Sequence, residues 1–144
     1  PVIARSAVFI VNKEEAERLL ECEPEPVPRL LKTLQTLGAR IVVITDGTQG
    51  SYATNGQEIW QCPIFPGKVI ERTGAGDSFA TAFSYALLQG DTLPEALQYG
   101  TAQAWSVVQY IGPQAGLLNK ITLEKTLKRF SKIRPKRIDK AFSS

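Results

Sequence analysis

The sequence contains no histidine and no methionine among its 144 residues. Without histidine, catalytic triads that use an imidazole and metal sites with imidazole ligands are excluded. A general base must therefore come from a carboxylate, a lysine, a tyrosine or a cysteine. Because the chain opens without methionine and runs directly into strand-like sequence, we expect a fragment or a processed product whose beginning lies elsewhere.

Cysteines and long apolar runs are also scarce. Cys22 and Cys62 are the two cysteines, and their spacing is not that of metal ligands, so we expect free thiols in a reducing compartment. No apolar run approaches the roughly 18 residues that a membrane helix needs. The opening residues, 1–5, lack the features of a signal peptide. We therefore expect a soluble, cytoplasmic protein that does not bind a membrane.

The composition is that of an ordinary globular domain, with 43% hydrophobic and 22% charged residues. The net charge of +3 arises late in the chain, where basic residues gather at Lys128, Arg129, Lys132, Arg134, Lys136, Arg137 and Lys140. A basic segment can bind nucleic acid, but no aromatic residues alternate with these charges and no binding motif accompanies them. We expect a domain over residues 1–133 and a basic, flexible tail over residues 134–144 that binds no nucleic acid.

The first part of the chain alternates between strand and helix patterns. The apolar runs Ala7–Val11 and Ile41–Thr45 are typical of strands buried on both faces. Helical patterns follow the first run at residues 13–20 and again at residues 27–37, where Gly38 ends the second helix. Such alternation indicates a parallel sheet covered by helices, which is an α/β fold.

The remainder predicts one hairpin and three helices. Asn55-Gly56 lies between two strand-like segments and favours a two-residue type I′ turn. The helices are expected at residues 76–89, at residues 92–110 with Pro94 in the first turn, and at residues 122–132 with Thr122 as the cap.

The segment Thr73–Asp77 places the small residues Gly74, Ala75 and Gly76 immediately before a helix. Backbone N–H groups at such a position can approach an anion closely, and the helix dipole adds positive potential. Asp77 could then take a proton from a hydroxyl that attacks a bound phosphoryl group. The alternative is an ordinary glycine turn with Asp77 as a capping acid, and these residues alone leave both readings open.

Four segments in this order resemble the C-terminal half of the ribokinase-like (PfkB) family of carbohydrate kinases. They are Asn12-Lys-Glu-Glu15, Thr45-Asp-Gly47-Thr-Gln-Gly50, Thr73-Gly-Ala-Gly-Asp-Ser-Phe-Ala-Thr-Ala-Phe83 and Gly112-Pro-Gln-Ala-Gly116. The resemblance implies a three-layer α/β/α fold with a mostly parallel sheet, truncated to its C-terminal portion and without the small β lid of that family.

The resemblance also implies an ATP-dependent phosphotransferase that acts on a hydroxyl of a sugar or similar small substrate. Asp77 would be the catalytic base, and the N–H groups of Gly74, Ala75 and Gly76 would hold the γ-phosphoryl group. Asn12 and Glu15 would organise Mg²⁺, with Glu15 acting through water; the same pair also fits a helix capping box. The nucleotide would be bordered by Thr45, Gly47, Gly50, Thr101 and Gly112.

The chain departs from the family pattern in two ways. Glu71-Arg72 replaces the usual Asp-Thr, so a monovalent cation such as K⁺ would have Glu71 and the carbonyl of Thr73 as candidate ligands. The N-terminal half that would orient the sugar and form a homodimer contact is not in this sequence. The alternative function is therefore a non-catalytic nucleotide-binding or interaction module that retains the kinase fold.

Overall fold

The computed structural model describes residues 8–67, 75–108 and 120–139. Its strands are β1 (Val8–Asn12), β2 (Ile41–Thr45), β3 (Ser51–Thr54), β4 (Ile59–Cys62) and β5 (Lys136–Arg137). Its α-helices are α2 (Lys13–Leu20), α3 (Val27–Thr36), α4 (Ala75–Leu88), α5 (Leu93–Val108) and α6 (Lys120–Arg129). A short 3₁₀ helix, Gly47–Gln49, connects β2 to β3. No helix in these described ranges is both long and apolar enough to cross a membrane.

The five described strands form one sheet in the order β1-β2-β3-β4-β5. β1 and β2 are parallel, as the alternation of strand and helix predicts. The β2–β3, β3–β4 and β4–β5 pairs are antiparallel. Over the described residues the sheet is therefore mixed, and the expectation of a mostly parallel sheet applies only to β1 and β2. The connections from β2 to β3 and from β3 to β4 are too short for the crossover that a parallel pair needs, so the chain reverses there.

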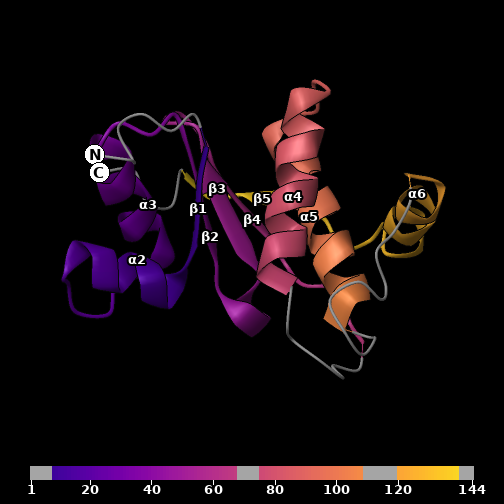
Figure 1. The fold of residues 1–144 in the computed structure, drawn as a ribbon, viewed down its shortest axis with the longest axis horizontal. Coiled ribbons are helices and arrows are strands. Elements are labelled where there is room, and N and C mark those ends of the chain that lie inside the picture. Colours follow the sequence, from indigo (N-terminus) through magenta and orange to yellow (C-terminus); the bar gives the residue numbers. More distant parts are fainter. Residues whose placement is uncertain (1–7, 68–74, 109–119, 140–144) are drawn as a thin grey trace.

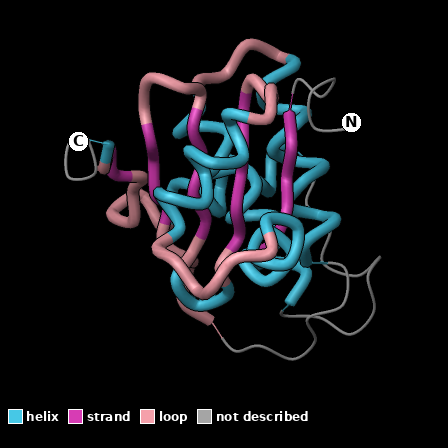
Figure 2. The backbone as a smooth tube through the Cα atoms, turned by 90° about the vertical axis from the view of Figure 1, so that its left-hand side faces the viewer, coloured by secondary structure: helices cyan, strands magenta, loops and turns pink. Residues whose placement is uncertain are grey.

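The helices lie on both faces of the sheet and produce three layers (Figure 1). α2 and α3 cover one face, and α4 and α5 cover the other. Figure 2, seen from the side of α2 and α3, shows the long strands side by side behind these helices. This is the three-layer α/β/α arrangement expected from the sequence.

β2 explains why both faces must be covered. Val42 and Ile44 pack against Leu30, Leu31 and Leu34 of α3, which are fully buried. Val43 points to the opposite face and packs with Phe83 of α4 and Leu97 of α5. Alternate side chains of a strand point to opposite faces, so a continuous apolar run needs a helix layer on each side.

The β3–β4 hairpin differs from the expected two-residue turn. Thr54 pairs with Ile59, which leaves the four residues 55–58 in the loop. Asn55 does not have the positive φ that a type I′ turn requires at its first central residue. Its side-chain oxygen instead accepts hydrogen bonds from the backbone N–H groups of Gln57 and Glu58, at 3.0 and 2.9 Å. The asparagine therefore closes a longer turn by a side-chain bond, which competes with the tighter backbone turn.

Two expectations about the last helix are wrong. Thr122 does not cap the last helix but lies inside α6, where its carbonyl oxygen accepts from the Thr126 hydroxyl at 2.9 Å. That helix also ends at Arg129 rather than at residue 132. The tail is not free at residues 136–139, because β5 pairs with β4.

Ion pairs help to hold β5 on the sheet, and the number of basic residues in the sequence did not indicate them. Arg137 forms ion pairs with Asp139 at 2.7 Å and with Glu58 at 3.4 Å. The backbone N–H of Ile138 donates to the Ile59 carbonyl oxygen at 2.8 Å. Acidic partners on both sides of Arg137 thus offset one of the basic residues and hold the strand on the sheet.

The contact between α4 and α5 depends on a glycine. A Cβ placed on Gly100 would lie 2.8 Å from two ring carbons of Phe79, which is too close for undisturbed packing. We expect Gly100→Ala to lower the free energy of unfolding by about 1–3 kcal/mol through overpacking. This expected loss of stability is opposite in sign to the gain of about 1 kcal/mol that replacing glycine by alanine usually gives inside a helix. Urea unfolding of Gly100→Ala, Phe79→Leu and the double variant tests this: the double variant should lose less than the sum, and a more stable Gly100→Ala would contradict the expectation.

Candidate active site

Four residues form a row across one edge of the sheet. In the strand register, Asn12 pairs with Thr45, Thr45 with Ser51, and Ser51 with Cys62. β1 and β2 end at this edge, β3 begins there and β4 ends there. Ligands of open α/β sheets bind beyond the carboxyl ends of parallel strands, which makes this edge the place to look for a site.

Asn12 and Glu15 form the predicted capping box at the start of α2. The Glu15 N–H donates to the Asn12 side-chain oxygen at 2.7 Å, and the Asn12 N–H donates to Glu15 Oε1 at 2.9 Å. Both residues are exposed at the end of β1. The structural role of this pair is therefore confirmed, and it leaves the pair at the same sheet edge as Thr45.

The loop between β2 and β3 is compact and uses two glycines in different ways. The Asp46 N–H donates to the Gly50 carbonyl at 2.8 Å, and the Gly50 N–H donates to the Gly47 carbonyl at 3.1 Å. A Cβ on Gly50, whose φ is 91°, would lie 2.2 Å from the carbonyl oxygen of Cys62. A Cβ on Gly47, whose φ is 52°, would meet nothing within 4 Å. Gly50 is thus required by the packing of β4, whereas Gly47 faces open space.

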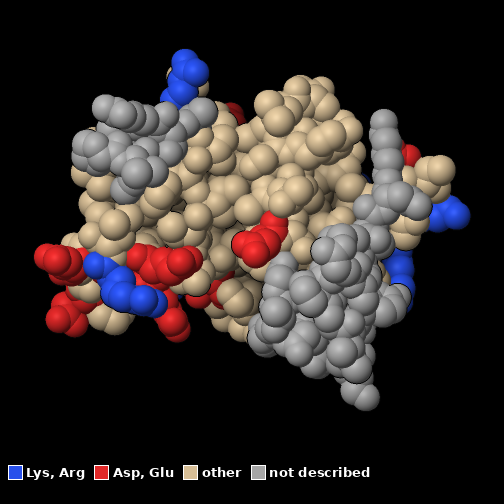
Figure 3. All heavy atoms as spheres, in the orientation of Figure 1, with Lys and Arg blue, Asp and Glu red and all other residues tan. Residues whose placement is uncertain are grey.

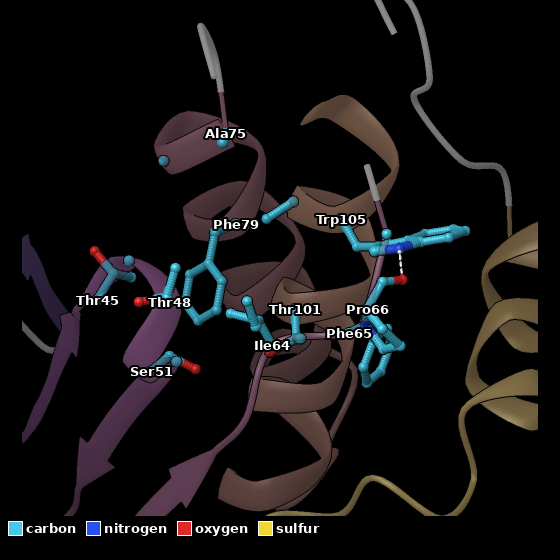
Figure 4. Close-up of a pocket in the computed structure, with 15 residues that line it drawn as sticks. Thr45, Thr48, Ser51, Ile64, Phe65, Pro66, Ala75, Phe79, Thr101 and Trp105 are labelled. Atoms are coloured by element: carbon cyan, nitrogen blue, oxygen red, sulfur yellow. Dashed lines mark hydrogen bonds between the residues drawn. The ribbon is translucent and has the colours of Figure 1, made fainter. Parts of the chain in front are cut away.

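A pocket of about 280 Å³ lies between this loop, α4 and α5 (Figure 4). Thr45, Thr48 and Ser51 lie on one side, and Ile64, Phe65, Pro66 and Trp105 lie on the other, with the ring of Phe79 extending between them in this view. Gly47, Gly50, Gly67, Ala75, Gly76, Thr101 and Ala104 complete the lining. None of the fifteen lining residues is charged, so the interior suits a flat, uncharged group.

Residues from three elements hold the outer wall of the pocket in place. Trp105 Nε1 donates to the Pro66 carbonyl oxygen at 2.8 Å. Phe130, directly after α6, stacks on Phe65 with ring centroids 4.7 Å apart and meets Trp105 edge-on at 5.1 Å. The Arg129 guanidinium lies 5.7 Å from the Trp105 ring centroid. α6 therefore supports the pocket although it contributes no lining residue.

The first turn of α4 brings the predicted catalytic loop to the pocket. Ala75 and Gly76 line it, and a Cβ on Gly76 would meet nothing within 4 Å. Asp77 is exposed in the same turn and is not among the lining residues. The first N–H groups of a helix lack intrahelical partners, so the start of α4 offers hydrogen-bond donors beside the uncharged pocket.

Two groups of charged side chains lie at opposite ends of the molecule. Figure 3 shows acidic side chains gathered over α2 and the loop that follows it, and basic side chains over α6. The acidic group is Glu14, Glu15, Glu17, Glu21, Glu23 and Glu25. Among the described residues, no three aspartates, glutamates or cysteines cluster in a way that could hold a metal ion. A metal at Glu15 would therefore need ligands beyond the side chains of this region.

The structure brings most of the described candidate residues together in one place. Thr45, Gly47, Gly50, Ala75, Gly76 and Thr101 all line the pocket. Asn12 and Glu15 lie at the neighbouring strand end and Asp77 lies beside the pocket, so these three do not line it. The candidates Glu71, Thr73, Gly74 and Gly112 fall outside the described residues.

Sequence reasoning missed the residues that form the walls. Phe79 was not among the predicted site residues, although it lies in the Thr73–Phe83 segment, and Trp105 and Pro66 meet over a separation that no local pattern reveals. Ser51 gave one usable signal, since it directly follows the last glycine of the Thr45–Gly50 segment. A small polar residue at the start of a strand that reaches the site could have been included on that ground.

Cys62 lies beside Thr101, one of the lining residues, and does not itself line the pocket. It is fully buried, and its Sγ lies 3.4 Å from Thr101 Oγ1, which also donates to the Leu97 carbonyl oxygen at 2.7 Å. Burial raises the pKa of the Cys62 thiol to about 11, and the Thr101 hydroxyl offsets this only in part. Cys62 is therefore an inert, protonated thiol at neutral pH.

Comparison with known proteins identifies the class. The pattern of the pfkB family carbohydrate kinases matches residues 2–120, and the chain belongs to this family. An ATP-dependent 6-phosphofructokinase from Thermoanaerobacterium thermosaccharolyticum is 32% identical over 111 residues, which cover 77% of this chain and 34% of that protein.

Solved structures agree with the family assignment. A ribokinase from Arabidopsis thaliana, complexed with ribose and ATP, superposes with a TM-score of 0.82 at 27% identity and covers 88% of this chain. A ribokinase II candidate from Escherichia coli, in complex with ATP and Mg²⁺, gives a TM-score of 0.78 at 25% identity over 89% of this chain. The chain spans 42% and 41% of those two proteins and about a third of the phosphofructokinase, 34%.

The two loop glycines should respond differently to substitution. We expect Gly50→Ala to lower the free energy of unfolding by about 3 kcal/mol or more, because the added Cβ meets the rigid backbone of Cys62 and φ is unfavourable. Gly47→Ala is the matched control and should cost about 1–2 kcal/mol, from φ alone. Urea unfolding of the two variants measures this difference, and equal losses would contradict it.

Ionisation of Cys62 should weaken the fold at high pH. Since folding raises this pKa from an ordinary value of 9.0 to about 11, the stability contributed by the neutral thiol is complete below pH 9 and is lost as the pH rises through 11. Relative to Cys62→Ala, the wild-type free energy of unfolding should fall by about 2–3 kcal/mol over this window. Other titrating groups contribute equally to both proteins, so their effect cancels in the difference between the two free energies of unfolding. If that difference did not change with pH, the thiol would not ionise in this way.

Proposed function

We propose that this chain is the ATP-binding and catalytic portion of a kinase that transfers the γ-phosphoryl group of ATP to a hydroxyl of a sugar or similar small substrate. The observation that carries the proposal is the pocket itself. It joins the Thr45–Gly50 segment, the first turn of α4 and Thr101 of α5 around one uncharged cavity. The relatives support it, since one is an ATP-dependent kinase and two solved neighbours bind ATP.

The two parts of the nucleotide would bind at different places in the pocket. The adenine ring would occupy the uncharged interior between the β2–β3 loop and the wall of Ile64 and Trp105. The triphosphate would extend toward the start of α4, where the N–H groups of residues 74–76 would meet the γ-phosphoryl charge. Thr101 of α5 would border the nucleotide. Gly112, which is outside the described residues, would border it as well.

Asp77 would act as the base. Its carboxylate would accept the proton of the acceptor hydroxyl as that oxygen bonds to the γ-phosphorus and the bond from this phosphorus to the bridging oxygen of ADP breaks. The products are ADP and the phosphate ester. An exposed position beside the nucleotide pocket, rather than inside it, fits a group that must reach the acceptor.

Ions would assist at two places. Mg²⁺ would neutralise phosphate charge, and Asn12 and Glu15 would contact its waters, which agrees with an exposed carboxylate whose Oε1 is already held by a backbone N–H. K⁺ would bind Glu71 and the Thr73 carbonyl. Residues 1–133 would form the catalytic part.

Partners of the whole protein are further proposals. The acceptor would be a small sugar-like molecule, bound largely by parts of the protein that this chain does not include. The full-length protein would be cytoplasmic and could form a homodimer, and it would bind neither nucleic acid nor membrane.

Replacement of the proposed catalytic base, Asp77, tests the chemistry. In the full-length protein, we expect Asp77→Asn to lower kcat by about 10²–10⁴-fold, because a neutral amide cannot accept the proton. The dissociation constant for Mg·ATP should change by less than about twofold, since Asp77 does not line the pocket. Phosphotransfer to a panel of sugars and isothermal calorimetry provide the two measurements.

Asp91→Asn, just beyond the other end of α4, is the matched control and should keep its activity. A loss of less than tenfold in Asp77→Asn would remove Asp77 as the base. ATP binding by a full-length protein that phosphorylates no sugar would instead favour a non-catalytic nucleotide-binding module.

A further inference from the structure

Ser51 has a buried hydroxyl that has no partner among the residues that the structure describes. The residue is 4% exposed, and its Oγ forms no hydrogen bond with residues 8–67, 75–108 or 120–139. It also lines the pocket. In Figure 4 its oxygen points toward the side on which Ile64 and Thr101 lie. A hydroxyl that is buried and unpaired in a native protein is uncommon and usually has a cause.

The strand register explains why Ser51 is placed there. It pairs with Thr45 on one side and Cys62 on the other, so it lies in the row of strand-end residues beneath the pocket. Gly50, immediately before it, packs against the Cys62 carbonyl and leaves β3 little freedom to move away. The backbone of Ser51, and with it the Cβ that carries the hydroxyl, is thus held in place from both sides.

Thr101 and Trp105, two other polar residues of the lining, already have hydrogen-bond partners. Thr101 Oγ1 donates to the Leu97 carbonyl at 2.7 Å, and Trp105 Nε1 donates to the Pro66 carbonyl at 2.8 Å. The Cys62 thiol lies 3.6 Å from the Pro63 carbonyl. Ser51 therefore retains both a donor and an acceptor function toward the cavity that it lines.

We propose that Ser51 is a specificity-determining residue whose hydroxyl hydrogen-bonds to the polar edge of the nucleotide base. This inference rests on the proposed ATP site. The base, rather than the phosphates, is the matching group because the lining around Ser51 is uncharged, while the phosphate donors lie at the start of α4. A site with a pre-placed, unpaired hydrogen-bonding group rejects ligands that cannot pair with it.

Removal of the hydroxyl should change stability and binding in opposite senses. Ser51→Ala deletes an unpaired polar group, so the midpoint temperature of the free full-length protein should rise by about 2–4 °C. The same change removes a bond to the base, so the dissociation constant for Mg·ATP should rise about three- to tenfold. A merely structural serine would give lower stability or unchanged binding.

Thr54→Val is the matched control on the same strand. The Thr54 hydroxyl is also buried, but it donates to the Glu58 carbonyl at 2.8 Å and does not line the pocket. Its removal should lower the midpoint temperature and leave Mg·ATP affinity unchanged. The pair of variants therefore separates loss of a ligand contact from loss of a hydroxyl as such.

A ligand that lacks the nucleobase completes the test. The affinity for Mg·tripolyphosphate should be equal in wild type and Ser51→Ala, since the phosphates do not reach Ser51. Equal Mg·ATP affinities in these two proteins would overturn the role of Ser51 while leaving the nucleotide site intact. A loss of tripolyphosphate affinity would show that Ser51 contacts phosphate instead, and wild-type protein that binds no ATP would overturn both this inference and the proposed function.

Discussion

The close approach of Gly50 to the Cys62 carbonyl is the constraint on which the site depends. No side chain fits between these two backbones, because a Cβ on Gly50 would lie 2.2 Å from that oxygen. The contact fixes where β3 begins relative to the end of β4 and so places Ser51 beneath the pocket. The loop before it, closed by Asp46 and Gly47, is held by the same backbone bonds. One backbone contact therefore sets the position of one side of the cavity.

The opposite side depends on packing across long separations in the chain. The wall residues Phe65 and Trp105 are fixed by Phe130, which follows α6, and by the bond from Trp105 to Pro66. Aromatic contacts of this kind bury large areas and prefer stacked or edge-on geometries, so they orient the rings as well as hold them. The pocket beside the start of α4 thus depends for one of its walls on Phe130, a residue far along the chain.

Local patterns predicted the local parts of this structure. β2 was predicted residue for residue because Ile41–Ile44 is an uninterrupted β-branched, apolar run followed by Thr45, and the Asn12–Glu15 capping box was confirmed with both of its hydrogen bonds. The hairpin turn was wrong because the Asn55 side chain closes a longer loop. The pairing of β5 could not be predicted because the acidic partners of Arg137 are distant in sequence or follow it. Of the site, the glycine-rich segments could be read from the sequence, whereas Phe79 and Trp105 could not, since only tertiary packing brings them together.

Two buried hydroxyl groups that line the pocket differ in whether the protein already gives them a hydrogen-bond partner. Thr101 and Ser51 are both buried hydroxyls that line the same cavity. Thr101 satisfies its donor within its own helix through the Leu97 carbonyl, as helical threonines commonly do. Ser51 begins a strand, where the backbone ladder is occupied by Thr45 and Cys62 and offers its side chain no partner. The secondary structure of each residue therefore decides which hydroxyl is structural and which remains available to a ligand.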